Sequence, residues 1–503
     1  MPRTLAPEQC AELTPTSSPL AELDADVVVV TAGTDASGVL ALAEDALAID
    51  RASGGALRAA LERGGFRPAW AAQRFVNLPG TPFGAVLVVG TGPEGGRETG
   101  PAGGDPGALR VTLRERRHAL AAGVAGLTGG RVAVCAGGAW DTLLVEAAAL
   151  ATYRFDRYSD RPRPAELLVS CARLPGEDEL AELSSRLRSV CFARDWVNLP
   201  GGHKRPEAST ALLLEEAGSS GVEARVWTTE ELAALGAGGL VGVGQGSAEP
   251  ARLVRLTARG TNGGPPLVLI GKGLTYDAGG VNLKTTWLEH MKLDMGGAAA
   301  CAGAVFHAGR RPRGRTVVAW IALAENLMSA TSYLTGDVLR MHAGTSVEVT
   351  NTDAEGRLAL ADAMSIADAG NAAALLTVAT LTGSAIMSLG PRTAAVHSAD
   401  DRLSAQLLDS AAAAGESAWR LPHLPYLAES LRSHIADLSN VGTPQGQSMV
   451  AAEFLRHFAP AGVPYLHVDL AGPAYNMGEP YDGVPAGGTG YGVRTLIELV
   501  DRL

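Results

Sequence analysis

Apolar runs separated by glycine and proline predict alternating strands and helices along the first third of the chain. The runs at 26–30, 84–89 and 131–134 have the length and valine content of strands. Stretches rich in alanine and leucine lie between them and predict helices, as does the longer stretch 178–198, which ends just before Pro200. The segment 91–107 is rich in glycine and proline, has no periodicity and predicts an exposed loop.

The rest of the chain repeats this alternation on a larger scale. Further strands are predicted at 251–257, 266–270, 315–322, 374–379 and 465–469. Strands alternating with helices are typical of a mainly parallel sheet flanked by helices. Because 503 residues exceed what one core usually supports, we expect an α/β protein of two domains. These are a small N-terminal α/β domain (1–175), a connecting helix (176–200) and a larger C-terminal catalytic domain (201–503).

Charge and cysteine content narrow the classes of function. The chain has 42 basic and 53 acidic side chains and a formal net charge of −11, which argues against a nucleic-acid groove or an anionic membrane partner. The five cysteines are scattered and lack a CxxC spacing, so they are expected to be reduced thiols. No secretory leader or membrane-length apolar window is apparent. We therefore expect a cytoplasmic enzyme.

Two segments concentrate charge beside apolar strands. Residues 271–284 read GKGLTYDAGGVNLK, with Asp294 following ten residues later, and residues 351–358 read NTDAEGRL. Both are expected to be loops, and the four glycines of the first would allow positive φ and close approach to a ligand. The acids Asp277, Asp294, Asp353 and Glu355 cannot all ionise together without a neutralising charge, for which two divalent cations are the simplest source. An isolated Asp-x-Glu is more often a solvated turn, whereas the full ordered set favours a metal centre.

These segments resemble the leucyl aminopeptidases, also called cytosol aminopeptidases, which are dinuclear-metal exopeptidases. The resemblance spans roughly 190–495 and includes the segments 242–247, 324–326, 336–338, 379–383 and 467–472. It implies one metal site formed by Lys272, Asp277, Asp294 and Glu355, and a second formed by Asp277, Asp353 and Glu355. It also implies that Lys284 polarises the scissile carbonyl and that Arg357 holds a bicarbonate ion acting as general base.

The resemblance further implies a homohexamer and a substrate pocket, and the chain departs from the family pattern in places. The residues implied to bind substrate are Met291, Asn351, Thr380, Leu381 and Gly383. At 285–287 the sequence Thr-Thr-Trp replaces a more polar turn, and Ala474 stands where some members place a methionine against the substrate side chain. The preference for leucine is therefore open.

The sequence thus predicts a metal-dependent exopeptidase that hydrolyses the N-terminal peptide bond of peptides or dipeptides. A water bridging two divalent cations is the expected nucleophile. None of the ten histidines has a zinc-ligand spacing such as HExxH, and a donor set of oxygens with one amine suits Mn²⁺, Zn²⁺ or Mg²⁺. Two alternatives stay open: a dedicated dipeptidase for Cys-Gly or a biosynthetic conjugate, and a non-catalytic structural or binding hexamer.

Overall fold

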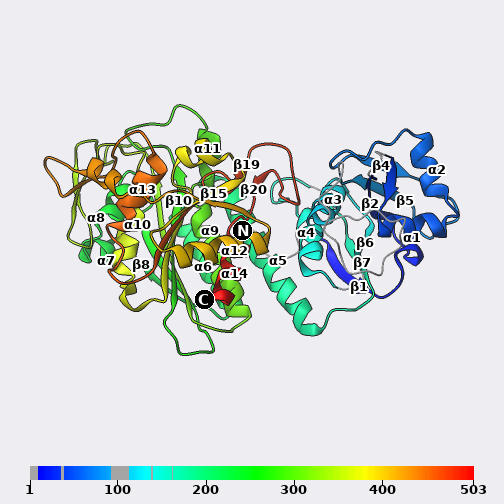
Figure 1. Ribbon diagram of the computed structural model, residues 1–503. Coiled ribbons are helices and arrows are strands. Elements are labelled where there is room, and N and C mark those ends of the chain that lie inside the picture. The colour runs from blue at the N-terminus through cyan, green and yellow to red at the C-terminus, as the bar shows by residue number, and fades with distance from the viewer. Residues whose placement is uncertain (1–9, 36–38, 92–112, 138–139, 161) are drawn as a thin grey trace. The chain divides into compact units, whose positions relative to one another are not determined.

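The computed structural model describes residues 10–35, 39–91, 113–137, 140–160 and 162–503, and they divide into two compact units (Figure 1). The N-terminal unit comprises residues 10–187 with Gly478–Ala486, and the C-terminal unit comprises Arg188–Met477 with Gly487–Leu503. The domain limits expected at 175 and 200 stay a prediction. Apart from Thr91, the expected loop at 91–107 lies outside the described residues. No helix in the described part of the chain is long and apolar enough to span a membrane.

The N-terminal unit is a sheet between two layers of helices. Its strand order is β1-β7-β6-β2-β5-β4, with β3 beside β2. Alternate valines of β2 face opposite cores: Val29 packs with the cluster that includes α3 and α4, whereas Val28 and Val30 pack with the cluster of α1 and α2. The elements are β1 (Glu12–Thr16), η2 (Leu20–Glu22), β2 (Val27–Thr34), β3 (Leu40–Leu42), α1 (Glu44–Ala52), α2 (Ala56–Arg63), β4 (Gln73–Val76), β5 (Ala85–Gly90), α3 (Leu113–Ala125), β6 (Arg131–Gly137), α4 (Thr142–Ala151) and β7 (Glu166–Cys171).

The C-terminal unit is built around an eight-stranded sheet of order β16-β15-β18-β14-β10-β11-β9-β8. The neighbours from β18 to β11 are parallel, and antiparallel pairs join β15, β9 and β8 to them. The expected fold class, α/β with mainly parallel sheets flanked by helices, is confirmed. All five strands predicted for this region are present. Four of them are mainly apolar and buried, whereas β9 includes two arginines and is partly exposed.

The first half of this unit follows the 22-residue helix α5 (Glu177–Asn198), which coincides closely with the helix predicted at 178–198. It contains η3 (Gly201–His203), α6 (Pro206–Ser220), β8 (Glu223–Trp227), α7 (Thr229–Ala234), α8 (Gly238–Gly244), β9 (Arg252–Ala258), β10 (Leu267–Asp277), η4 (Leu288–Leu293), α9 (Gly296–Arg310), β11 (Val317–Asn326), β12 (Val338–Arg340) and β13 (Ser346–Glu348). The second half contains α10 (Gly356–Ile366), η5 (Ala369–Asn371), β14 (Ala374–Ala379), α11 (Gly383–Leu389), β15 (Thr393–His397), α12 (Asp401–Ala414), β16 (Ser417–Arg420), η6 (Pro425–Leu431), β17 (Leu438–Ser439), α13 (Gln447–Arg456), β18 (Tyr465–Asp469), β19 (Tyr475–Asn476), β20 (Gly487–Gly488) and α14 (Val493–Arg502).

Helices α9 and α10 cover opposite faces of the central strand β10. A side chain at Gly271 would meet Ala298 of α9, whereas the side chain of the next residue, Lys272, runs past Gly356 at the start of α10. Successive residues of a strand point to opposite faces, so the two helices must lie on different sides. The lysine is thereby placed under the N-terminal end of α10.

Four neighbouring strands end at the same edge of the sheet. Strands β10, β11, β14 and β18 end at Asp277, Asn326, Ala379 and Asp469, and their registers place Asp277 opposite Asn326 and Ala379 opposite Asp469. The carboxyl ends of parallel strands are where ligand sites form in open α/β sheets. Polar residues at the ends of these strands are therefore brought together from distant parts of the sequence.

Candidate functional site

Strand β10 is longer than the sequence predicts, and Lys272 lies within it. The expectation of a loop from Gly271 onward is wrong, because the strand continues to Asp277 and pairs with β11 along its whole length. Gly271 and Gly273 do not provide positive φ; a Cβ on Gly271 would lie 2.7 Å from Cα of Ala298, and one on Gly273 would lie 2.6 Å from a neighbouring carbonyl oxygen. These glycines permit close packing of the strand rather than a turn.

The buried amine of Lys272 meets acids from two other segments. Its Nζ lies 2.8 Å from Oδ1 of Asp294 and 2.9 Å from Oε1 of Glu355, and it donates to the carbonyl oxygen of Thr380 at 3.1 Å. Burial alone would lower the pKa of Lys272, but the surrounding carboxylates outweigh it and raise that pKa. The structure thus joins β10, the end of η4 and the N-terminus of α10 around one nitrogen.

Asp277 closes β10 and is oriented by the backbone turn that follows it. Its Oδ1 accepts hydrogen bonds from the backbone N–H of Gly279 and from Nδ2 of Asn326, both at 2.8 Å. Gly279 and Gly280 have φ of +89° and +65°, so the predicted positive-φ turn is present at these two positions. The other carboxylate oxygen, Oδ2, pairs with Lys284.

Lys284 returns from the same turn toward the carboxylates. Its Nζ lies 2.9 Å from Oδ2 of Asp277 and also forms an ion pair with Asp353. Burial opposes charge on this amine, yet the nearby carboxylates raise the pKa of Lys284. The side chain is one-fifth exposed, unlike that of Lys272, so this ammonium group faces the open side of the site.

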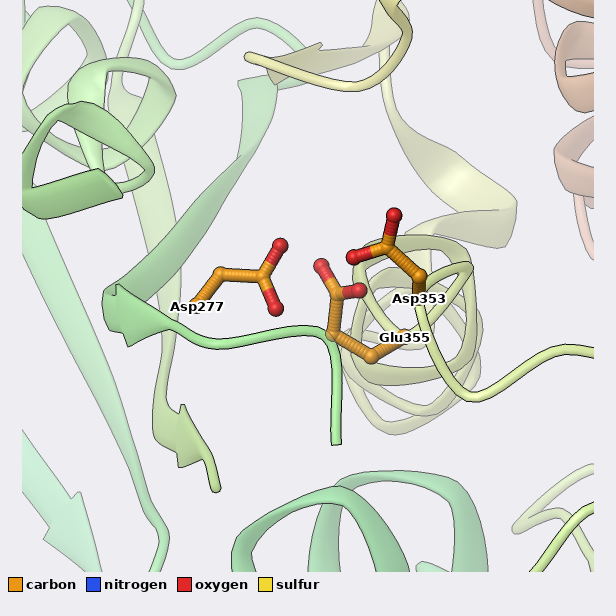
Figure 2. Close-up of side chains that lie close together, drawn as sticks. All are labelled: Asp277, Asp353 and Glu355. Carbon is orange, nitrogen blue, oxygen red and sulfur yellow. The ribbon is translucent and has the colours of Figure 1, made fainter. Parts of the chain in front are cut away.

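Asp353 and Glu355 approach Asp277 from the loop that leads into α10. Figure 2 shows the three carboxylates directed toward one another, and an oxygen from each lies within 4.8 Å of the others. Burial, followed by the charges of Asp277 and Glu355, raises the pKa of Asp353 to about 6. Burial likewise raises the pKa of Asp294. Burial and the repulsion between neighbouring carboxylates both disfavour the charged form of an acid, so raised pKa values are expected where acids pack together.

Arg357 is the second residue of α10 and is buried. Its Nη1 donates to the carbonyl oxygen of Asn440 at 2.7 Å, while its Nε has no hydrogen-bond partner among the described residues. Burial lowers the pKa of Arg357 to about 10, so the guanidinium stays charged at neutral pH. Arg357 is also one of the residues that line the cavity described next.

A cavity of about 490 Å³ lies over these groups. It is lined by all the predicted metal, catalytic and substrate residues except Glu355, which is almost fully buried. Asn351 lies beside the acids and accepts the backbone N–H of Asp353 at 2.8 Å, and Thr380 donates its hydroxyl to Asp294 at 2.8 Å. Met291, Leu381 and Gly383 contribute to the wall. The structure therefore brings the complete predicted set to one place.

Two residues that support the site were not among the predicted site residues. Asn326 donates from Nδ2 to Asp277, to the carbonyl oxygen of Thr352 at 3.0 Å and to Glu355 at 3.4 Å. Asp469 accepts the backbone N–H of Leu381 at 3.1 Å and the hydroxyl of Thr382 at 2.6 Å. Both are polar residues that end buried strands, which is the signal that could have identified them.

The charges of the inner site do not balance within the described residues. Four carboxylates face two ammonium groups and one guanidinium, which leaves one negative charge uncompensated. Oxygen donors at this density are the ligand type that Mg²⁺ and Mn²⁺ prefer and Zn²⁺ accepts. The arrangement is thus suited to divalent cations beside a charged lysine and a charged arginine.

Comparisons with known proteins agree with this geometry. Residues 191–497 match the model of the cytosol aminopeptidase family, catalytic domain. A probable cytosol aminopeptidase of Streptomyces coelicolor is 37% identical over 95% of this chain and 96% of its own length, and one of Micrococcus luteus is 36% identical over 97% and 98%. The solved structure of the bottromycin maturation enzyme BotP in complex with Mn is similar with a TM-score of 0.80 at 35% identity, covering 95% of this chain and 99% of that one. A tomato leucine aminopeptidase mutant gives a TM-score of 0.83 at 25% identity, covering 98% and 97%.

Proposed function

The chain belongs to the cytosol aminopeptidase family and is a metal-dependent exopeptidase, and from this premise we propose which of its residues carry the reaction. Lys272, Asp277, Asp294 and Glu355 hold one divalent cation, and Asp277, Asp353 and Glu355 hold a second. The observation that supports this is the convergence of three carboxylates within 4.8 Å, with Lys272 and Asp294 directly beside them.

The donor set fits such ions by charge and by type. Four carboxylates against two ammonium groups and the Arg357 guanidinium leave one negative charge in a buried site, which is costly without a cation. When bound, a pair of divalent ions lowers the pKa of a shared water and polarises the peptide carbonyl. Lys272 can act as a ligand only as a neutral amine, and adjacent dications favour loss of its proton. Mn²⁺, Zn²⁺ and Mg²⁺ all suit these donors, and the related BotP structure is described as a complex with Mn.

Lys284 and Arg357 supply the charged groups of the reaction. The Lys284 ammonium, held by Asp277 and Asp353, faces the open cavity and donates to the oxygen of the scissile carbonyl as negative charge develops there. Arg357 presents a planar guanidinium to the same cavity, a geometry that binds a planar anion such as bicarbonate through paired hydrogen bonds. A bicarbonate held there would supply a general base for the attacking water.

The cavity favours a neutral N-terminal residue. Its lining residues beyond the predicted metal and catalytic groups are all uncharged, and many are apolar, among them Met291, Leu293 and Ile386. A charged substrate side chain would lose its hydration without gaining a partner. Met291, Thr380, Leu381 and Gly383 therefore enclose a neutral side chain, and Asn351 contacts the substrate backbone beside the reacting bond.

The proposed substrate is a peptide or dipeptide, and the family supports a proposal for the location and assembly of the protein. A cytoplasmic location is supported by the relatives, which are named cytosol aminopeptidases. A homohexamer is supported by the family resemblance alone. Light scattering coupled to size-exclusion chromatography measures it: a mass near six times 51.6 kDa is expected, and a monomeric peak would contradict the assembly without affecting the proposed chemistry.

The proposed function is tested with purified protein loaded with Mn²⁺ or Zn²⁺. We expect hydrolysis of leucine amide, dipeptides and longer peptides from the N-terminus, together with stoichiometric metal by elemental analysis. Faster cleavage of Cys-Gly with rejection of longer peptides would indicate a dedicated dipeptidase instead. The absence of both hydrolysis and bound metal would contradict the proposal.

Replacing Lys284 by alanine tests its role separately. Because the ammonium stabilises charge that develops in the transition state, kcat should fall by roughly 10² to 10³ with a smaller change in KM. Lys292→Ala is the control, since Lys292 lies eight residues later and does not line the cavity. Equal activities of the two variants would exclude Lys284 from the reaction. A biological phenotype that persists when the Lys284→Ala protein is inactive would instead favour the non-catalytic alternative.

A further inference from the structure

Trp287 combines an unfavourable backbone with an exposed aromatic side chain at the mouth of the cavity. It has φ of 62° and ψ of 18°, in the left-handed region that costs an ordinary side chain about 1–2 kcal/mol. The residue is 56% exposed and lines the cavity. More than half of the residue is exposed, so packing offsets only part of this cost, and strained backbone of this kind clusters at functional sites.

Two further large apolar side chains line the same cavity while exposed to a similar degree. Leu283 is 49% exposed and Met477 is 48% exposed. Together with Trp287 they form what we call the apolar rim, which contrasts with the buried charged groups at the cavity floor. Apolar groups that are exposed beside a binding site are available to bury the apolar surface of a ligand.

The direction in which a peptide runs through the cavity follows from the proposed function, on which this inference rests. An exopeptidase places the free N-terminus and the first peptide bond among the charged residues of the cavity. Five of these are almost fully buried: Lys272, Asp277, Asp294, Glu355 and Arg357. The remainder of the peptide has to leave through the open side of the cavity. The apolar rim, as the exposed part of the lining, therefore faces the residues that follow the scissile bond.

We propose that Trp287, with Leu283 and Met477, is a specificity determinant that binds an apolar or aromatic side chain located after the scissile bond. The substrate class is then a peptide with a neutral first residue and a large apolar second or third residue. The indole provides a flat apolar surface with little conformational entropy to lose, so stacking against an aromatic ring is the strongest contact it can make.

The test compares tripeptides that differ only after the scissile bond. With Mn²⁺-loaded full-length protein, kcat/KM is measured for Leu-Phe-Gly, Leu-Gly-Phe, Leu-Gly-Gly and leucine amide. At least one phenylalanine peptide should exceed Leu-Gly-Gly by roughly tenfold, the order of magnitude expected for partial burial of an aromatic ring. Trp287→Gly should reduce this preference to within about twofold while leaving leucine amide within about threefold, because leucine amide has nothing to place on the rim.

Glycine is the informative replacement because it removes the indole and adopts positive φ without strain. Trp419→Ala is the matched control: Trp419 is 64% exposed on β16 and does not line the cavity. The proposal is overturned if the wild-type protein shows no phenylalanine preference, or if Trp287→Gly keeps it. It is also overturned if Trp287→Gly slows leucine amide as much as the tripeptides, since the residue would then position Lys284 only. Failure of wild-type protein on every substrate would instead refute the proposed function itself.

Discussion

The site leaves no room for a side chain at Gly356. A Cβ at this position would lie 2.4 Å from Cε of Lys272 and 2.7 Å from its Nζ. Both atoms are fixed by Asp294 and Glu355, so the lysine cannot move aside without breaking its ion pairs. We expect Gly356→Ala to displace Lys272, to destabilise the protein by about 1–3 kcal/mol through overpacking, and to abolish stoichiometric metal binding. Elemental analysis and urea unfolding measure these effects.

Gly370→Ala is the control for that substitution, because a Cβ at Gly370 meets no atom within 4 Å and its φ is not positive. It should bind metal and unfold like the wild-type protein. A Gly356→Ala variant with full metal content and unchanged stability would show that the Lys272 side chain has room to move. In that case the contact between β10 and α10 is looser than the packing indicates.

The residues that the sequence identified at the site are those whose chemistry is conspicuous without neighbours. Asp353, Glu355 and Arg357 could be recognised because charge in a glycine-containing turn between apolar elements needs a reason. Asn326 and Asp469 are ordinary polar residues in isolation, and their roles arise only when their strands become neighbours in the sheet. Residue-level pattern reading therefore finds reacting groups more readily than the groups that orient them.

Lys204 connects the C-terminal turn of α5 with η4, the element that precedes Asp294. Its buried Nζ donates to the carbonyl oxygens of Trp196, Val197 and Lys292 at 2.9, 2.8 and 2.6 Å. Burial lowers the pKa of Lys204, but three acceptors need three N–H groups, which only the ammonium form has. Only four of the 42 basic residues are lysines, and each of the other three lies in or next to the site. A compact tetrahedral donor is required here, for which the planar guanidinium is no substitute.

We expect Lys204→Met to cost about 3 kcal/mol, because it keeps the side-chain volume but leaves three buried carbonyls without a donor. Urea unfolding of the two proteins gives the difference. Lys204→Arg should also be destabilising, whereas Lys292→Met, at a half-buried position with one long hydrogen bond of 3.3 Å, should cost much less. If Lys204→Met is as stable as the wild-type protein, water must satisfy these carbonyls equally well.

Strands β15 and β18 pair two buried histidines, which makes this part of the sheet sensitive to acid. His397 and His467 are partners in the antiparallel register, with ring centroids 5.8 Å apart. Burial lowers the pKa of His397 from 6.5 to about 4, and it lowers that of His467 as well. Between these pH values the unfolded chain binds a proton that the folded chain does not. The contribution of His397 to stability is therefore complete above pH 6.5 and is lost as the pH falls toward 4.

The shift at His397 corresponds to about 3 kcal/mol by linkage. His397→Gln keeps a hydrogen-bonding side chain beside Ser448 but cannot take up a proton. Because other buried groups titrate in the same range, the quantity to compare is the difference in unfolding free energy between variant and wild type at each pH. That difference should shift in favour of the variant between pH 7 and pH 4.5. The exposed His434→Gln serves as control, and a pH-independent difference for His397→Gln would contradict the argument.

The elements themselves were predictable where an apolar run decided the outcome, as for β14 and β18, whose predicted limits are those of the structure. The extension of β10 through Lys272 was not, because Gly-Lys-Gly has the composition of a loop. It forms a strand only because β11 offers a complete set of backbone partners and α9 needs the space that Gly271 leaves. Tertiary packing overrides local composition at this position.

At the scale of the whole molecule, two units with separate cores provide an internal reference for the effect of metal. The proposed ligands all belong to the C-terminal unit, where chelation would leave buried carboxylates to repel one another. A ligand present at 100 times its Kd stabilises the state that binds it by about 2.7 kcal/mol. Hydrogen exchange followed by mass spectrometry, with and without a chelator, resolves where that stabilisation acts. Peptides covering 267–294 and 351–358 should gain protection with Mn²⁺, whereas strands β2 and β5 of the N-terminal unit should exchange at the same rate in both conditions.

Asp277→Asn distinguishes specific binding from a general effect of the ion. Asp277 is proposed to contact both cations, so replacing its carboxylate by an amide should weaken both metal sites. The substitution keeps the size of the side chain and the hydrogen bonds that Oδ1 accepts. In this variant Mn²⁺ should leave exchange unchanged in both units. If Mn²⁺ protected the variant as strongly as the wild-type protein, or protected β2 and β5 as much as the site peptides, the ion would act elsewhere on the molecule. Asp277 would then not be a ligand of the proposed metal centre.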